Sequence, residues 1–187
     1  MDFDFDPEDM NDFDRRLYET TKFVGKLLIA GLVFRGVLFV IPTTYQVQAA
    51  FTSLIGYLLS FTGLEVMTEG IRLFTDEAVY IIVQDCLGWK SMAVFLGLMW
   101  ASTKRTLEHL NYILAGLGVL VIGNILRVFS TVYLAEIGLF SYEIIHGVLW
   151  RWSLTLLVLG IWGFWLRNRK KEDKFDKKIK EQVREFN

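Results

Sequence analysis

The sequence predicts a mainly α-helical fold, a polytopic membrane helix bundle of about four to five spans with an outer interfacial helix and a short extracytoplasmic β-hairpin. Three observations support this class. Hydrophobic residues make up 53% and aromatic residues 15% of the chain, with a mean hydropathy of +0.36, and a soluble domain rarely has such a composition. The charged residues gather in residues 1–19 and 167–187. Between these ends, long apolar runs follow one another.

A single domain is the natural count at this length, with a terminal segment on each side of it. Residues 1–21 form an acidic arm interleaved with Phe. It lacks the basic beginning of a signal peptide, so we expect a solvated or interfacial arm. Residues 22–166 form the membrane-embedded domain. Residues 167–187 are first basic, then mixed and helix-permissive, and we expect a cytoplasmic anchor on anionic lipid headgroups.

The formal net charge of −1 is not informative about nucleic acid, because the location of charges matters more than their sum. With most of its charges at the ends of an apolar chain, the protein is expected to have no nucleic-acid partner.

The first part of the domain contains one clear span and one shorter, more polar segment. Lys22–Ile41 is long enough to cross a bilayer, although Arg35 interrupts it and Pro42 stops it. Gln46–Phe61 is shorter and less apolar, with Gln, Thr and Ser side chains along it. We therefore expect it to be an interfacial or half-inserted helix.

The next segment, Leu64–Gln84, alternates apolar and polar residues on either side of Gly70. This pattern is typical of a β-hairpin, or of two short strands, outside the bilayer core. Three further apolar runs predict helices over Trp89–Thr103, Leu110–Val132 and Ile144–Leu166.

Basic loop residues set the orientation of these last three helices. Lys104 and Arg105, like the basic run after Leu166, should be cytoplasmic. The helices then run inward, outward and inward. Three chemically unusual residues consequently share the extracytoplasmic layer: Cys86, Arg127 and His146.

The orientation of the first part depends on how many segments cross the membrane. Arg15, Arg16 and the following lysines place the N-terminus in the cytoplasm. The first span then exits at Ile41, and a second full span would put Cys86 on the cytoplasmic side. Four spans with Gln46–Phe61 on the outer surface resolve the conflict. The alternative is an external N-terminus with five full spans.

Cys86 is the single cysteine, so it is either a buried small hydrophobe or a reactive thiol. The run DCLGWKS places it at a strand-to-helix transition, where backbone N–H groups and the helix dipole favour the thiolate. Lys90 lies one turn further on and adds positive charge or extends to headgroups. The negative charge of Asp85 disfavours the thiolate form of Cys86.

Arg127 lies in the apolar run GNILRVFS. An arginine facing lipid there costs a few kcal/mol, so it either extends to the interface or has a function. A guanidinium that cannot deprotonate holds a carbonyl oxygen, a thiolate or a substrate carboxylate. Asn124 lies one turn away on the same helix face and would orient it.

His146 is one of two histidines, and the other, His109, belongs to a cytoplasmic turn and is read as structural. Glu143 precedes His146 by three residues and would orient the imidazole on a helix, unless it merely begins the helix. One His, one Cys and scattered carboxylates do not form a convincing metal site, and we expect no metal and no cofactor.

These motifs, in this order, resemble the exosortase and archaeosortase family. They are DCLGWKS after a hairpin, GNILRV late in the next outward span, and His-Gly opening the last span. The likeness covers Gln46–Leu166 and includes TGLEVMTEGIRL. Bacterial members usually have Cys-Ser-Gly, whereas Leu87 follows Cys86 here. This departure favours the archaeal members or a divergent subfamily.

The resemblance implies a membrane cysteine protease or transpeptidase whose catalytic domain is residues 22–166. It would cleave the C-terminal tripartite sorting signal of secreted proteins (a short Pro- or Gly-containing motif, a hydrophobic helix and a basic end) at the outer face of the plasma membrane. Cys86 would attack the scissile carbonyl, Arg127 would stabilise the oxyanion or the thiolate, and His146 would protonate the leaving amine. A lipid headgroup would then resolve the thioester, whereas water as acceptor would make the enzyme a protease.

A competing interpretation is a non-enzymatic membrane assembly or transport subunit, in which Arg127 and His146 pair with a partner or line a polar path. It predicts insensitivity to thiol alkylation and no covalent intermediate.

Overall fold

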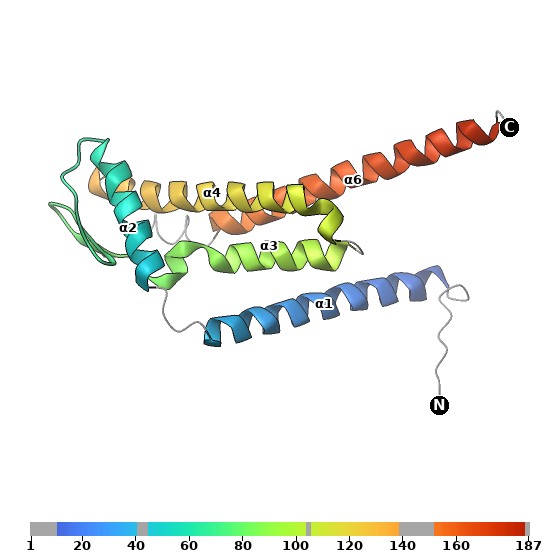
Figure 1. The fold of residues 1–187 in the computed structure, drawn as a ribbon, viewed down its shortest axis with the longest axis horizontal. Helices are drawn as coiled ribbons and strands as arrows, with labels where there is room; N and C mark the ends of the chain where they lie inside the picture. Colours follow the sequence, from blue (N-terminus) through green and yellow to red (C-terminus); the bar gives the residue numbers. More distant parts are fainter. Residues whose placement is uncertain (1–10, 41–44, 104–105, 139–151, 186–187) are drawn as a thin grey trace.

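Four long helices lie side by side in the computed structural model, which describes residues 11–40, 45–103, 106–138 and 152–185 (Figure 1). Helix α3 is central and contacts the other three. The four helices are α1 (Asp12–Val40), α3 (Trp89–Ser102), α4 (Leu110–Glu136) and α6 (Leu154–Glu185). A short 3₁₀ helix, η2 (Thr106–His109), leads into α4.

The predicted helices are confirmed within the described residues, with longer ends at three places. The predicted start of the last helix at Ile144 lies outside these residues. Helix α1 begins at Asp12, ten residues before the predicted start at Lys22, because the charged residues there are compatible with a helix. Helix α4 continues four residues past Val132. Helix α6 runs without a break to Glu185, so the basic tail is helical and extends beyond the rest of the bundle (Figure 1). The predicted segment boundaries at 21/22 and 166/167 therefore fall inside helices.

Helix α2 (Tyr45–Ser60) lies across one end of the bundle, steeply inclined to the long helices (Figure 1). Its buried side includes Thr52, Ile55 and Leu59, which face the sheet and α4. This orientation is the one expected of an interfacial helix, and the segment begins and ends within one residue of the predicted bounds.

A three-stranded antiparallel sheet packs beside α2, with strand order β1-β2-β3. The strands are β1 (Met67–Glu69), β2 (Arg72–Phe74) and β3 (Val79–Ile81). The predicted hairpin is β1 and β2, which turn at Gly70 with a positive φ of 58°. The third strand was not predicted: Leu73 pairs with Tyr80 across the second turn. Thr75 closes this turn, because its backbone N–H donates to the Ala78 carbonyl and its hydroxyl oxygen accepts the Ala78 N–H.

The interior consists of two apolar clusters at different levels of the bundle. One lies between α2, the sheet and the end of α4, and contains Cys86. The other joins α3, α4 and α6 around Phe95 and Met99, both fully buried. Where the alternative is water, each fully buried side chain of this size contributes roughly 2 kcal/mol.

Cations from two neighbouring helices cap the C-terminus of α3. Lys26 of α1 donates to the Thr103 carbonyl at 3.5 Å, and Arg169 of α6 donates to the Ser102 carbonyl at 3.0 Å. Positive charge at a helix C-terminus is favourable, because it meets carbonyls that have no partner within the helix. This end of the bundle is the one predicted to face the cytoplasm.

By length and composition, one helix of the described part of the chain, α4, qualifies as a membrane span on its own. The number of spans, their direction and the side on which the N-terminus lies stay predictions.

Candidate active site

Cys86 lies in a one-turn 3₁₀ helix, η1 (Gln84–Leu87), between β3 and α3. Gly88 then turns the chain into α3 with φ 76°. Two constraints require glycine there. Only glycine adopts such a φ without strain, and a Cβ atom would come within 2.9 Å of the Asn124 side chain.

Hydrogen bonds from several elements hold this turn in place. The Asn124 amide of α4 donates to the Cys86 carbonyl at 2.8 Å. The Trp89 indole donates to the Gln84 carbonyl at 2.9 Å, and Gln48 of α2 donates to the Ile82 carbonyl at 3.0 Å. The backbone of the Cys86 turn is thus fixed by α2, α3 and α4 together.

Asn124 therefore bonds to the cysteine turn, whereas we expected it to orient Arg127. It is 2% exposed, and its Oδ1 atom has no hydrogen-bond partner. An unsatisfied buried amide oxygen is costly, so the amide is positioned for its bond to Cys86 in spite of that cost.

Cys86 and Arg127 line one cavity of about 340 Å³. Cys86 is 8% exposed and Arg127 is 6% exposed. One wall is β3 and the chain leading to Cys86, and the other is the last third of α4. Beyond these two residues the lining is mostly apolar: Tyr80, Ile81, Ile82, Val83, Asp85, Val128, Thr131 and Val132.

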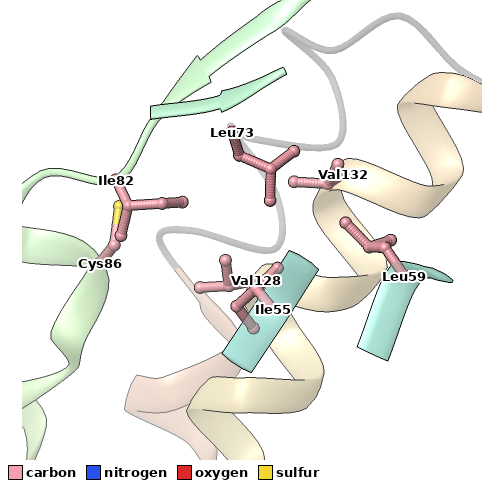
Figure 2. Packing of buried hydrophobic residues seen from close by; sticks show 7 residues of the cluster. All are labelled: Ile55, Leu59, Leu73, Ile82, Cys86, Val128 and Val132. Carbon is pink, nitrogen blue, oxygen red and sulfur yellow. The ribbon is translucent and has the colours of Figure 1, made fainter. Parts of the chain in front are cut away.

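Figure 2 shows how closely Cys86 is packed into this region. Its side chain lies beside Ile82, in the buried cluster that also contains Val128 and Val132 of α4. Ile82, Val128 and Val132 also line the cavity that Cys86 shares with Arg127.

Burial raises the pKa of the Cys86 thiol above its usual value, and the nearby Asp85 carboxylate adds to this rise. A backbone hydrogen bond from Val83 and the Arg127 guanidinium lower the pKa by a smaller amount. The backbone bond acts in the direction expected at a helix start, because it favours the thiolate. Desolvation outweighs it, and the residue is a thiol at neutral pH.

Lys90 donates to the Asp85 carboxylate at 2.8 Å, and both side chains are well exposed, at 65% and 48%. Lys90 thus forms an ion pair with Asp85 at the exposed edge of the Cys86 cavity. The support for Cys86 that we expected from Lys90 is reduced to partial neutralisation of that carboxylate.

His146 and Glu143 lie outside the described residues, so their meeting with Cys86 stays a prediction. The first described turn of α6 does reach the site, because Leu154 and Thr155 line a small pocket with Arg127. Within the described ranges, no group of three or more His, Cys, Asp or Glu residues is arranged as metal ligands are.

Glu136 is a functional residue that the sequence reasoning missed. It accepts hydrogen bonds from the Tyr80 hydroxyl at 2.7 Å and the Thr75 hydroxyl at 2.8 Å. These bonds hold β3, one wall of the cavity, against the end of α4. A carboxylate in the last turn of a helix is unfavourable for the dipole, and this anomaly is the signal that could have identified it.

Comparison with known proteins now identifies the family. Over residues 13–159 the sequence matches the family model described as transmembrane exosortase. The chain belongs to this family. It is therefore a membrane protein of a family of membrane transpeptidases or proteases. The match begins in α1, well before the start at Gln46 that the motifs alone indicated. No curated protein and no solved structure matches the chain.

Proposed function

We propose that this exosortase-family chain is a cysteine transpeptidase that cleaves C-terminal sorting signals of secreted proteins at the outer face of the plasma membrane. The observation that supports it most is the shared cavity. Cys86 and Arg127 come from segments about forty residues apart in the chain and line the same space. A nucleophile beside a permanent cation is what acyl transfer requires.

The first half-reaction follows from these side chains. The Cys86 proton passes to the imidazole of His146, and Sγ attacks the scissile carbonyl carbon. The carbonyl oxygen becomes negative, and the Arg127 guanidinium stabilises it. The C–N bond then breaks, and the amine leaves with the proton from His146. The product is a thioester on Cys86, which a lipid headgroup resolves.

Processing in cells that make the precursor tests the nucleophile. Cys86→Ala leaves the precursor uncleaved while the enzyme still inserts into the membrane. Ser53→Ala, on the exposed side of α2, is the matched control and processes normally. Normal processing by Cys86→Ala would overturn the assignment.

The role of Arg127 is tested by Arg127→Lys, which keeps the charge and loses the planar fork of donors. We expect processing to fall by about a hundredfold, the cost of losing one oxyanion donor. Unchanged turnover would show that Arg127 serves only to position the helix.

A further inference from the structure

Arg127 borders a second pocket, distinct from the Cys86 cavity. This pocket has a volume of about 150 Å³ and lies between the start of α3, α4 and the first turn of α6. Its lining is more polar: Asp85, Gly88, Lys90, Ser91, Arg127, Leu154 and Thr155. Arg127 therefore stands between two spaces, an apolar one that Cys86 lines and a charged one that opens beside α3.

The charged pocket suits a phosphate group. Lys90 and Arg127 supply positive charge, and Ser91 supplies a hydroxyl. Helix α3 begins at Trp89, and its first amide groups add the positive end of the helix dipole. Asp85 is the one carboxylate in the lining, and it is paired with Lys90 at the rim. A lipid headgroup with both a phosphate and an amine fits this lining, because the cations suit the phosphate and Asp85 suits the protonated amine.

An apolar groove of about 480 Å³ follows the same pair of helices, α4 and α6. It is lined by Tyr112, Ala115, Gly116, Val119, Leu156, Leu157, Gly160, Ile161 and Phe164. Along α4, Val119 at the end of the groove is eight residues from Arg127, about 12 Å at the helical rise. Along α6, Thr155 in the pocket directly precedes Leu156 in the groove. The apolar groove and the charged pocket therefore follow one another along α4 and α6, with the charged pocket nearer to Cys86.

An open space at Gly160 supports an occupant in the groove. A Cβ atom placed there would meet nothing within 4 Å. The groove is thus unfilled by the chain's own side chains at this point.

We propose that the charged pocket binds the phosphate-bearing headgroup of the acceptor lipid and that the α4–α6 groove holds one of its apolar chains. The inference rests on the proposed function, because it assigns the second substrate of the same thioester. Peptide substrate and lipid then approach from opposite sides of Arg127. The charge complementarity of the pocket favours a lipid over a second apolar helix, which offers no anion to Lys90 and Arg127.

In the second half-reaction the lipid headgroup resolves the thioester on Cys86. The amine or hydroxyl of the headgroup attacks the thioester carbonyl carbon, and a C–N or C–O bond forms. The C–S bond of the thioester breaks. The nucleophile's proton passes to the Cys86 sulfur, which returns to the thiol.

The first test measures lipid binding and does not depend on catalysis. The full-length protein is purified in detergent and loaded with phosphatidylethanolamine, and retained lipid is counted by native mass spectrometry. Lys90→Glu lowers retention by about tenfold, a change equal to one lost charge-assisted contact. Gly160→Phe also lowers retention, because its side chain occupies the groove. Gly163→Phe is the matched control, because its Cβ atom also meets nothing within 4 Å and it lies outside the groove lining. Equal retention by Lys90→Glu and Gly163→Phe would overturn the proposal.

The second test measures resolution of the thioester. The acyl-enzyme is formed with the precursor and then treated with phosphatidylethanolamine vesicles, soluble phosphoethanolamine or hydroxylamine at equal amine concentration. The proposal predicts that vesicles resolve it fastest. It also predicts that Lys90→Glu slows the reaction of the thioester with the vesicles about ten times more than its reaction with hydroxylamine. The reason is that hydroxylamine carries no phosphate for Lys90 to bind.

Two results contradict the proposal, and a third contradicts the proposed function on which it rests. Equal rates with vesicles and phosphoethanolamine would show that the groove holds no lipid chain. Slower formation of the acyl-enzyme by Gly160→Phe, with normal resolution, would show that the groove holds the substrate's hydrophobic helix. Absence of any acyl-enzyme in the wild type would count against the proposed function, and lipid retention would then decide the binding site on its own.

Discussion

At the scale of single residues, Cys86 is subject to two opposing influences. Burial and Asp85 raise the pKa of its thiol, whereas the Val83 backbone and Arg127 lower it. The result is a nucleophile that is protonated at rest. In the proposed mechanism it loses its proton to a base, and this is the role that we propose for His146, because Arg127 cannot perform it.

This balance predicts the rate of thiol alkylation. Because the pKa is raised, alkylation of Cys86 by iodoacetamide is slow at neutral pH and increases as the pH rises, with the thiolate fraction. Asp85→Asn removes a charge that raises the pKa, so alkylation at a fixed pH becomes faster. Glu77→Gln, a carboxylate loss on the exposed turn before β3, is the control and leaves the rate unchanged. Slower alkylation in Asp85→Asn would contradict the electrostatic account.

Gly88 provides a second prediction at this scale. Gly88→Ala introduces a Cβ atom at positive φ and against Asn124, at a cost of about 1 to 3 kcal/mol. The Cys86 turn shifts to relieve it, and processing falls by at least about tenfold. Gly118→Ala, where a Cβ atom meets nothing within 4 Å, serves as the comparison in the same processing assay. Equal activity of the two variants would show that the turn tolerates displacement.

At the scale of elements, the cavity depends on how β3 is held against α4. Glu136 makes this connection through Tyr80 and Thr75. The sheet is small, and its three-residue strands have little stability of their own. Glu136 therefore contributes to the geometry of this cavity wall, together with the pairing of β3 with β2 and the Gln48 bond to the Ile82 carbonyl.

Glu136→Ala should loosen that wall while the bundle stays intact. Loss of the acceptor costs about 1 kcal/mol at this partly exposed site. Hydrogen exchange measured by mass spectrometry then increases in residues 67–81 and stays constant in α3 and α6. Tyr80→Phe removes one of the two bonds and should show a smaller increase. Uniform exchange throughout the chain in Glu136→Ala would contradict a local role.

The opposite end of α3 provides a matched prediction about stability. Arg169→Ala removes the cap on the Ser102 carbonyl and the contact of the guanidinium with the Trp165 ring, 5.4 Å from its centroid. Thermal unfolding in detergent should occur several degrees lower, as a loss of about 1 kcal/mol implies. Arg167→Ala, two residues away and exposed, should leave the midpoint unchanged. Equal shifts in the two variants would show that only net charge matters.

At the scale of the whole molecule, apolar runs and turn residues were sufficient to predict the helices and the meeting of Cys86 with Arg127. Helix α1 was predicted too short, because charged residues such as Arg15 and Glu19 are compatible with both a helix and an arm. Strand β3 was missed because its pairing with β2 depends on a turn at Thr75. The pKa of Cys86 and the partner of Asn124 could not be predicted, since both depend on tertiary packing.

The architecture also fixes the position of the Cys86 turn. The long helices provide a rigid frame, and α2 with the sheet closes one end of it (Figure 1). The Cys86 turn lies at the junction of these two parts, where side chains of three helices donate hydrogen bonds to its backbone carbonyls or to the Ile82 carbonyl just before it. A site built on rigid elements keeps its geometry better than one on a free loop.

The most direct test of the central claim is the intact mass of the enzyme after brief incubation with its precursor and acid quenching. The account predicts an added mass equal to the cleaved precursor, carried by the peptide that contains Cys86 and removed by hydroxylamine. It is absent in Cys86→Ala and much reduced in Arg127→Lys. Cleavage of the precursor with no such adduct on Cys86 would contradict the account.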